Sequence, residues 1–584
     1  MPSSAPANPG EPDSKKLLCF LALVGLALFV IALTGYPNLL DNERRVGAYA
    51  LDLLQNGHWF AQSDADGDPI SKPPLLTWLV ALFSLPFDRI TLVSLYLPSA
   101  AATVALALIL FSVGREKFGW RAGFLGALSF LLSIMADQQM TTSRYDGLFS
   151  LPVTLAALAA YRGWTTGRGW TCFWLSVAFG SLVKGPLALV LGASGLLAAF
   201  WEKKSGTPLR IRGSHWLGIG LFMLIGFGWL ALAYAEMGKP LIDKLIGREL
   251  VGHAVTGHGK ESLLSKCWEP TYAYFAVFLP WSIAGASGMW RVWKHPSPDT
   301  ETRRFERFLF CWFFVGLVLF SVAAHQRSRL IVPLIPAAAL LAGRELARWT
   351  TAWNQRRLLQ ASGLVTCVFL VLMAIFHFVL LGGKTAVQRT IAVRTMAADL
   401  KALAGEQFPL TYTDSPFALQ IYLNTMRPQV TAAAAAAMLR GSIPAFVATG
   451  DDDYARLKKE ISTNSPAIYE LARWPETGKP FLVILSNHPR LEWPAHSVML
   501  DGALRIETQG VRLARKRKGI LFFEKDLAAG AAIFTNTSKE PMKVRLRLIG
   551  ESKSADEELS LPPGETRRKE FALSSRDSLK TAAR

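Results

Sequence analysis

Long apolar runs separated by short polar segments dominate the first two thirds of the chain. A helix that crosses the hydrocarbon core needs about 20 apolar residues, or fewer where neighbouring helices shield its ends. The run at 75–87 is too short to cross and contains Pro86 near its end, so we expect a short helix at the membrane surface there. The other runs predict about eleven transmembrane helices, at residues 16–35, 92–113, 122–136, 148–161, 170–183, 186–201, 214–235, 271–290, 308–324, 330–343 and 358–382.

The first apolar run follows Lys15 and Lys16 and a Pro/Ser/Ala-rich stretch. It is longer than the apolar core of a signal peptide and lacks a convincing small-residue cleavage site. We therefore expect it to be retained as the first transmembrane helix.

After residue 383 the long apolar runs stop and the composition becomes that of a soluble domain. Residues 383–490 alternate helical stretches with short strand-like runs such as PFLVIL, which predicts a small α/β domain. Residues 491–584 contain successive strand-like runs separated by Gly, Pro and Asn turns, which predicts a β-sandwich. The sequence thus predicts a mainly α-helical membrane domain at 1–382, with a first outer loop at 36–74, followed by two extracytoplasmic domains.

The composition agrees with a membrane protein. The chain is 51% hydrophobic and only 18% charged, and it contains 18 Trp and 34 Phe, which is too apolar and aromatic for an ordinary soluble enzyme. Its five cysteines have no paired or metal-like spacing, so neither a disulfide framework nor a zinc site is predicted.

The charges in the loops indicate how the helices are oriented. If the N-terminus is cytoplasmic, the inner segments hold 20 Lys and Arg against 8 Asp and Glu, whereas the outer segments hold 12 against 13. This asymmetry follows the positive-inside rule. The net charge of +19 is therefore explained by membrane orientation rather than by nucleic-acid binding, and an odd number of crossings places the C-terminal domains outside.

The first outer loop begins with charged residues directly after the first helix. Asp41, Glu43 and Arg44 lie there at the predicted level of the lipid head groups. A carboxylate in this place can take a proton from an acceptor hydroxyl, although such charges also simply solvate the end of a helix. His58 and Trp59 follow in the same loop, after a predicted turn.

Lys72 precedes Pro73 and Pro74 at the point where the chain returns to the membrane. The two prolines would fix the direction of the Lys72 ammonium, which suits a lipid phosphate at head-group depth. A lysine that only anchors the interface is the alternative. The DADGD run at 64–68 lacks the glycine offset and the closing glutamate of a calcium loop, so it predicts a turn.

Three further outer loops add charged candidates. Arg144 and Asp146 come just before an apolar helix, where Asp146 could also act as a structural carboxylate of the first turn. Lys184 lies in a tight turn between two apolar helices, where an unpaired lysine is costly. The next long outer loop carries His258 and Lys260.

Taken together, these motifs resemble the bacterial members of the protein O-mannosyltransferase superfamily, including the aminoarabinose transferases that modify lipid A. The resemblance covers roughly residues 16–345. The motifs that carry it are Asp41 after the first helix, Gly57-His58-Trp59, Gly67 ahead of Lys72-Pro73-Pro74-Leu75, Arg144-Tyr145-Asp146, Lys184-Gly185-Pro186, and Phe320-Ser321 ahead of Pro333 and Pro336.

The resemblance implies a multi-pass glycosyltransferase of the GT-C fold. Such an enzyme takes a sugar from a polyprenyl-phosphate donor and transfers it with inversion, on the outer face, to a hydroxyl of a lipid, glycan or protein. On the matching positions it implies catalytic carboxylates at Asp41 and Asp146, donor-phosphate contacts at Lys72, Lys184, Arg144, Lys260 and His258, and a substrate loop with Glu43, Arg44, His58 and Trp59.

This chemistry needs a base for the attacking hydroxyl and cations for the departing phosphate. A lipid phosphate is already a good leaving group, so we expect that the reaction requires no metal and no cofactor. A divalent ion with a structural role near the first loop is compatible with this expectation. The expected partners are the donor lipid, the acceptor and the bilayer, with no nucleic acid. The expected location is the bacterial inner membrane.

Two other functions are compatible with a multi-pass chain. A lipid or glycan transporter or flippase with an extracytoplasmic binding domain should bury paired charges near the bilayer midplane and often contains inverted repeats. Here the apolar runs are nearly free of charge, which favours the transferase. A surface assembly protein that binds carbohydrate through its C-terminal part would leave the charged first loop without a role.

Overall fold

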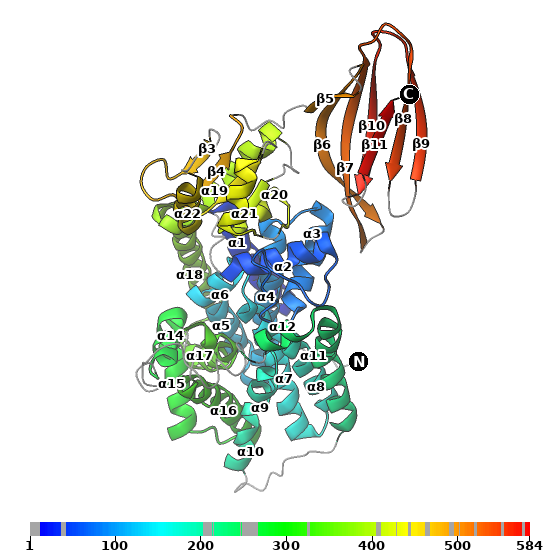
Figure 1. The fold of residues 1–584 in the computed structure, drawn as a ribbon. Helices are drawn as coiled ribbons and strands as arrows, with labels where there is room; N and C mark the ends of the chain where they lie inside the picture. The colour runs from blue at the N-terminus through cyan, green and yellow to red at the C-terminus, as the bar shows by residue number, and fades with distance from the viewer. Residues whose placement is uncertain are drawn as a thin grey trace. The chain divides into compact units, whose positions relative to one another are not determined.

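The chain folds into two compact units in the computed structural model (Figure 1). The first comprises Met1–Ala50, Trp59–Gln62 and Pro69–Gln388, and the second comprises Leu51–His58, Ser63–Asp68 and Arg389–Arg584. The structure describes residues 12–36, 42–202, 213, 215–245, 247, 267–323, 328–404, 410–427, 429–441, 445–461, 468–489, 496–500, 503–518, 522–549, 554–574 and 578–583.

The described part of the first unit is helical. Its elements are α1 (Ser14–Thr34), α2 (Asn42–Asn56), α3 (Leu75–Ser84), η1 (Leu85–Phe87), α4 (Leu92–Phe118), α5 (Trp120–Leu131), α6 (Ile134–Met140), α7 (Tyr145–Thr166), α8 (Trp170–Lys184), α9 (Leu187–Ser194), η2 (Gly195–Leu197), α10 (Ala198–Trp201), α11 (His215–Met237), α12 (Lys239–Ile242), α14 (Glu269–Phe278), α15 (Trp281–Lys294), α16 (Thr300–Val322), η5 (Ser328–Leu334), α17 (Ile335–Trp349), α18 (Gln355–Ile375), η6 (Phe376–Leu380) and η7 (Leu381–Gly383). The last residues of α2 belong to the second unit.

Six helices in the described ranges are long and apolar enough to cross a membrane. They lie at Ser14–Thr34, Leu92–Phe118, His215–Met237, Thr300–Val322, Arg329–Trp349 and Gln355–Gly383. The other predicted crossings are also helical: α7 is one continuous helix of 22 residues, and the others are shorter or interrupted. The short helix predicted at 75–87 is present as α3 and η1.

The predicted helix at 122–136 is two helices in the structure, as is the one at 271–290, which is divided into α14 and α15. Within 122–136, α5 ends at Leu131 and α6 begins at Ile134. The Ser133 side chain causes this break, because its Oγ accepts a hydrogen bond from the Ala136 N–H at 3.2 Å and so caps a new helix. The segment between α5 and α7 therefore contains a short helix of its own.

Glycines allow α4, α5 and α17 to approach closely. A Cβ placed on Gly114 of α4 would lie 2.6 Å from the Cα of Gly123 in α5. A Cβ on Gly343 of α17 would lie 2.6 Å from the Cα of Gly126, also in α5. Small residues at such contacts are typical of helices that pack within a membrane, where close van der Waals packing drives association.

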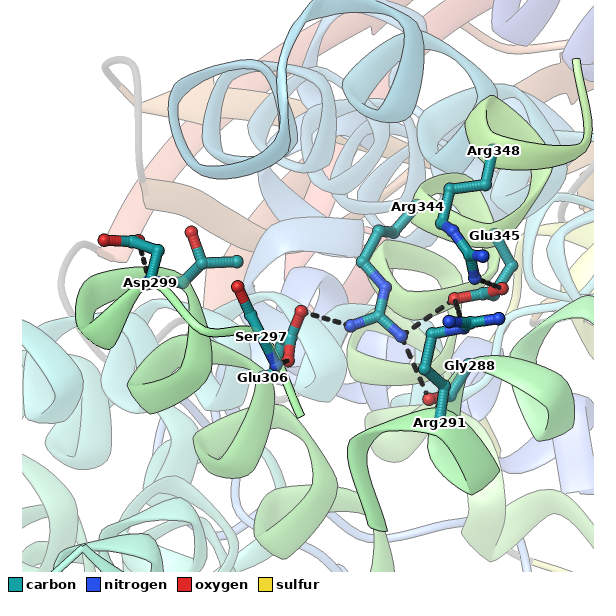
Figure 2. A network of polar contacts seen from close by, with 9 residues as sticks. Gly288, Arg291, Ser297, Asp299, Glu306, Arg344, Glu345 and Arg348 are labelled. Atoms are coloured by element: carbon teal, nitrogen blue, oxygen red, sulfur yellow. Dashed lines mark hydrogen bonds and ion pairs between the residues drawn. The ribbon is translucent and has the colours of Figure 1, made fainter. Parts of the chain in front are cut away.

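A buried network of charges joins α15, α16 and α17 (Figure 2). Arg344 is 8% exposed and forms ion pairs with Glu306 and, at 2.8 Å, with Glu345. Glu345 also pairs with Arg348 at 2.8 Å and with Arg291 at 3.4 Å. Buried charges are costly unless they are paired, so these contacts fix the ends of the three helices relative to one another.

The second unit begins with an α/β fold. A four-stranded sheet has the order β1-β2-β4-β3, in which β1 and β2 are parallel and the other pairs are antiparallel. Alternate residues of its strands point to opposite faces: Phe446 and Ala448 pack with α19 and α20, whereas Val447 packs with α21 and α22. The bounds are α19 (Thr385–Ala404), β1 (Leu410–Thr413), α20 (Phe417–Leu423), α21 (Ala432–Arg440), β2 (Phe446–Thr449), α22 (Asp451–Ile461), β3 (Tyr469–Trp474) and β4 (Leu482–Ser486).

The remaining strands form two antiparallel sheets. One has the order β10-β7-β6-β5 and the other the order β11-β8-β9. Leu504 and Phe534 of the first sheet share an apolar core with Val544, Leu559 and Leu561 of the second, so the two sheets pack on each other. The bounds are β5 (His496–Leu500), β6 (Leu504–Lys518), β7 (Phe522–Asn536), β8 (Met542–Ile549), β9 (Ser554–Leu561), β10 (Thr566–Ser574) and β11 (Ser578–Ala583).

Two pieces of the 36–74 loop belong to the second unit. The side-chain amide of Gln55 donates to the Asn424 carbonyl and accepts from the Met426 N–H at 2.5 Å. The Gln429 N–H donates to the Ala65 carbonyl at 2.7 Å. These bonds tie the end of α2 and the turn at 64–68 to the α/β fold.

Candidate functional site

Asp146 and Lys184 form a buried ion pair where two helices end. Asp146 lies in the first turn of α7 and is 3% exposed, while Lys184 is the last residue of α8 and its side chain is 14% exposed. The Lys184 Nζ donates to Asp146 Oδ1 and also lies 5.7 Å from the centre of the Phe149 ring. The positions are favourable, because a carboxylate suits the N-terminal end of a helix dipole and a cation suits the C-terminal end.

The pair brings together two residues that are 38 positions apart in the sequence. Arg144, the residue before α7, is held through its backbone: its carbonyl accepts a hydrogen bond from the Ser99 Oγ of α4 at 2.9 Å. Because the Lys184 ammonium already has a carboxylate partner, an incoming phosphate would share this cation with Asp146. The arrangement therefore suits both a structural role and the binding of an anion next to a carboxylate.

Lys72 lies in a short segment whose two ends are fixed. Before it, the Ile70 N–H donates to the Gln62 carbonyl at 2.8 Å; after it, Pro74 is the N-cap of α3. The Lys72 side chain is half-buried. Fixing the backbone on both sides limits the volume that a long lysine side chain can sample.

Trp59 is part of the same arrangement. Its carbonyl accepts a hydrogen bond from the indole Nε1 of Trp78 in α3 at 2.7 Å, and a second from the Gln62 side chain. The Ala61 N–H donates a hydrogen bond of 3.1 Å to the side chain of Glu236, near the end of α11. These bonds hold residues 59–62 against the helices of the first unit.

Replacing Trp78 by phenylalanine is expected to loosen residues 59–62. Phenylalanine keeps an aromatic ring but cannot donate to the Trp59 carbonyl, and a hydrogen bond of this kind contributes about 1 kcal/mol to stability. Faster hydrogen–deuterium exchange at 59–62 and a lower thermal midpoint are the expected results. Trp216→Phe is the matched control, because Trp216 is 87% exposed on α11; equal exchange in the two variants would contradict the prediction.

His58 is oriented by a buried carboxylate within the second unit. Asp52 is 3% exposed, and its two oxygens lie 3.1 Å from His58 Nδ1. The same carboxylate accepts from the Asn56 side chain at 2.6 Å and from the Ser63 N–H at 2.8 Å. The Asp52 carboxylate therefore joins His58, Asn56 and the Ser63 backbone in one group of hydrogen bonds.

Other predicted site residues lie beyond the described ranges. Asp41, His258 and Lys260 are outside them, and for Glu43 and Arg44 the structure describes the backbone within α2 but not the side chains. The DADGD run forms the predicted turn, in which Asp64 Oδ1 accepts from the Asp66 and Asp68 N–H groups. Among the described residues, no group of three or more His, Cys, Asp and Glu side chains is placed to hold a metal ion.

The structure also contains a pair that the loop motifs do not reveal. His377 Nε2 in η6 lies 3.0 Å from Asp137 Oδ1 in α6, and both residues are buried. The sequence signal for this pair was His377 itself, the one histidine in the largely apolar run 358–382. Its partner could not be identified, because 240 residues separate the two.

The sequence matches a known family and several known proteins. Residues 71–231 match the family described as "Dolichyl-phosphate-mannose-protein mannosyltransferase". The chain is 23% identical over 340 residues to an undecaprenyl phosphate-alpha-4-amino-4-deoxy-L-arabinose arabinosyl transferase 1 of Pseudomonas fluorescens, which covers 56% of this chain and 57% of that protein. It is 25% identical over 339 residues to an uncharacterized protein of Aquifex aeolicus, covering 57% and 74%. The match thus spans less than two thirds of the Pseudomonas relative.

The fold also matches solved structures. ArnT from Cupriavidus metallidurans bound to undecaprenyl phosphate matches with a TM-score of 0.66 and 16% identity, over 82% of this chain and 100% of that chain. The apo form of the same protein matches with a TM-score of 0.62. At this identity the likeness shows the fold. The predicted mainly helical fold is therefore confirmed, and the predicted resemblance to the mannosyltransferase superfamily agrees with the family match at 71–231.

Proposed function

We propose that the protein is a membrane glycosyltransferase that moves a sugar from a polyprenyl-phosphate donor to a hydroxyl acceptor outside the membrane, with inversion. One observation carries the proposal. The family match at 71–231 includes Lys72, Arg144, Asp146 and Lys184, and two of these, Asp146 and Lys184, meet in a buried pair at the ends of α7 and α8. Similarity to transferases named for undecaprenyl-phosphate aminoarabinose supports the donor class.

In this proposal the acceptor oxygen attacks the anomeric carbon, and the bond from that carbon to the phosphate oxygen breaks. Asp41 takes the proton from the acceptor hydroxyl, and the polyprenyl phosphate leaves. Asp146 is the second carboxylate and supports the positive character that grows on the sugar. Cations stabilise the departing phosphate; those proposed are Lys72, Lys184, Arg144, Lys260 and His258.

Further parts of the proposal concern the surroundings of the reaction. We place the protein in the bacterial inner membrane with about eleven crossings, a cytoplasmic N-terminus and extracytoplasmic C-terminal domains, an α/β domain at 383–490 and a β-sandwich at 491–584. Glu43, Arg44, His58 and Trp59 would line the path of the substrate. The proposed chemistry uses cations and carboxylates of the chain, so chelators are expected to leave the rate unchanged.

The test is transfer by the purified protein in proteoliposomes. Radiolabelled polyprenyl-phosphate sugars, pentose and hexose in turn, are supplied with lipid, glycan and peptide acceptors, with and without EDTA. Donor-dependent appearance of label in an acceptor is the expected result. Translocation of labelled lipid without transfer from any donor would overturn the proposal in favour of a flippase.

Lys72→Ala is expected to raise the donor KM about 10- to 100-fold, with a smaller effect on kcat. A hydrogen bond to a charged group contributes about 1.5–3 kcal/mol, and the phosphate is present both before and during the reaction. Lys72→Arg keeps the charge and is expected to lose less. Lys239→Ala, at an exposed lysine of α12, is the control; a donor KM unchanged in Lys72→Ala would remove this residue from the donor site.

A further inference from the structure

His377 is a buried ionisable residue near the end of a helix whose surface is mostly exposed. Val371, Phe378 and Val379 around it are exposed, as expected for a helix in contact with lipid, whereas His377 is 3% exposed. His377 lies in a π-helical turn, η6, which directly follows α18. Such turns are frequent at functional sites, and an ionisable side chain at membrane depth needs a partner.

The partner is Asp137 of the short helix α6. His377 Nε2 lies 3.0 Å from Asp137 Oδ1 and 3.2 Å from Oδ2, and Asp137 is 4% exposed. Both carboxylate oxygens are thus within hydrogen-bond distance of the imidazole nitrogen. The contact joins the last long apolar helix to the second outer loop.

The backbone of His377 contacts the end of the first helix. Its carbonyl accepts a hydrogen bond from the Tyr36 N–H at 3.1 Å. The packing is tight, since a Cβ placed on Gly35 would lie 2.8 Å from the His377 Cβ. Asp41, the proposed base, follows Tyr36 by only five residues. The start of the first outer loop is therefore anchored at His377.

The other side of α6 contacts the start of α7. A Cβ placed on Gly147 would lie 3.0 Å from the Gln139 Cβ and 3.1 Å from its Oε1. Gly147 is the neighbour of Asp146, the second proposed carboxylate. A shift of α6 would thus be transmitted directly to the turn that carries Asp146.

We infer that His377 is a positioning residue: its carbonyl holds the end of α1, from which the chain continues to Asp41, and its imidazole holds α6, which contacts the turn that carries Asp146. The inference rests on the proposed function for the roles of those two carboxylates. A contribution to folding alone would change stability and leave the kinetic constants of the folded protein as they are. Positioning acts on kcat, because misplacing a reacting group by about 1 Å can cost about 100-fold in rate.

His377→Leu is expected to lower kcat about 10- to 100-fold while donor KM changes little. His377→Gln, whose amide can still donate to Asp137, should recover most of the loss. Thr366→Val is the matched control, because Thr366 is a buried polar residue of α18 whose hydroxyl bonds only within its helix, to the Ser362 carbonyl. Full kcat in His377→Leu, or an equal loss in Thr366→Val, would overturn the inference.

The double variant Asp137→Asn/His377→Leu keeps the test valid if His377→Leu alone fails to fold, because it leaves no unpaired charge buried. It too is expected to lose kcat, and full kcat in this variant would overturn the inference.

Hydrogen–deuterium exchange at residues 133–147 provides a second readout that does not depend on activity. Exchange is expected to be faster in His377→Leu than in the wild type and unchanged in Thr366→Val. Equal exchange in all three proteins would overturn the inference. If the wild type transfers no sugar, the proposed function fails, and this measurement still decides whether His377 holds the second loop.

Discussion

Asp41→Asn is expected to lower kcat about 100- to 10,000-fold, the usual range for loss of a general base, while donor KM stays close to that of the wild type. Asparagine keeps the size of the side chain but cannot accept the proton of the attacking hydroxyl. The donor phosphate is bound by cations in our proposal, so its affinity should not depend on this carboxylate. Single-turnover transfer from a radiolabelled donor, with donor binding measured separately, checks both parts.

Asp88→Asn is the control for Asp41→Asn. Asp88 is exposed after η1 and has a backbone φ of 51°, a left-handed conformation that asparagine also tolerates. Its substitution removes a carboxylate from a neighbouring loop and should leave transfer unchanged. If Asp41→Asn retains kcat within about threefold, the base lies elsewhere in the chain.

Lys184→Met is expected to lower both stability and activity strongly. The substitution leaves Asp146 buried without its cation, and removing one partner of a buried ion pair costs about 3–5 kcal/mol. Transfer should fall more than about 100-fold, because the departing phosphate also loses a preorganised cation. Thermal unfolding and the transfer rate of the folded fraction are measured together.

The double variant Asp146→Asn/Lys184→Met separates the two effects. It removes both charges, so stability should recover most of the loss, whereas transfer should stay low. Recovery of transfer along with stability would show that the pair holds α7 and α8 together without taking part in the reaction. Low transfer in a stable double variant supports a direct role.

The helices were predictable because their signal is local. Each apolar run predicted from the sequence corresponds to a helix or to consecutive helices, and the short run at 75–87 was recognised by its length. The break within 122–136 also has a local cause, the cap formed by Ser133. A serine within an apolar run gives no sign of whether its hydroxyl will bond to its own helix or begin a new one.

The partners of the charged residues were not predictable in the same way. The sequence identified Asp146 and Lys184 as candidates, but their spacing gave no reason to pair them. Asp137 and His377 are still farther apart, and only the folded chain brings them within 3.0 Å. Patterns with a period of two or 3.6 residues report which face of an element is buried, and not which distant element covers it.

The division of the first outer loop between the two units limits how parts of the chain can be exchanged between relatives. A chimaera that replaces only residues 389–584 would separate Gln55 and Ala65 from the backbone groups of Asn424, Met426 and Gln429 that they bond. The unit that must be exchanged as a whole is therefore discontinuous in the sequence. It consists of the C-terminal part together with residues 51–58 and 63–68, and a graft should carry all three segments.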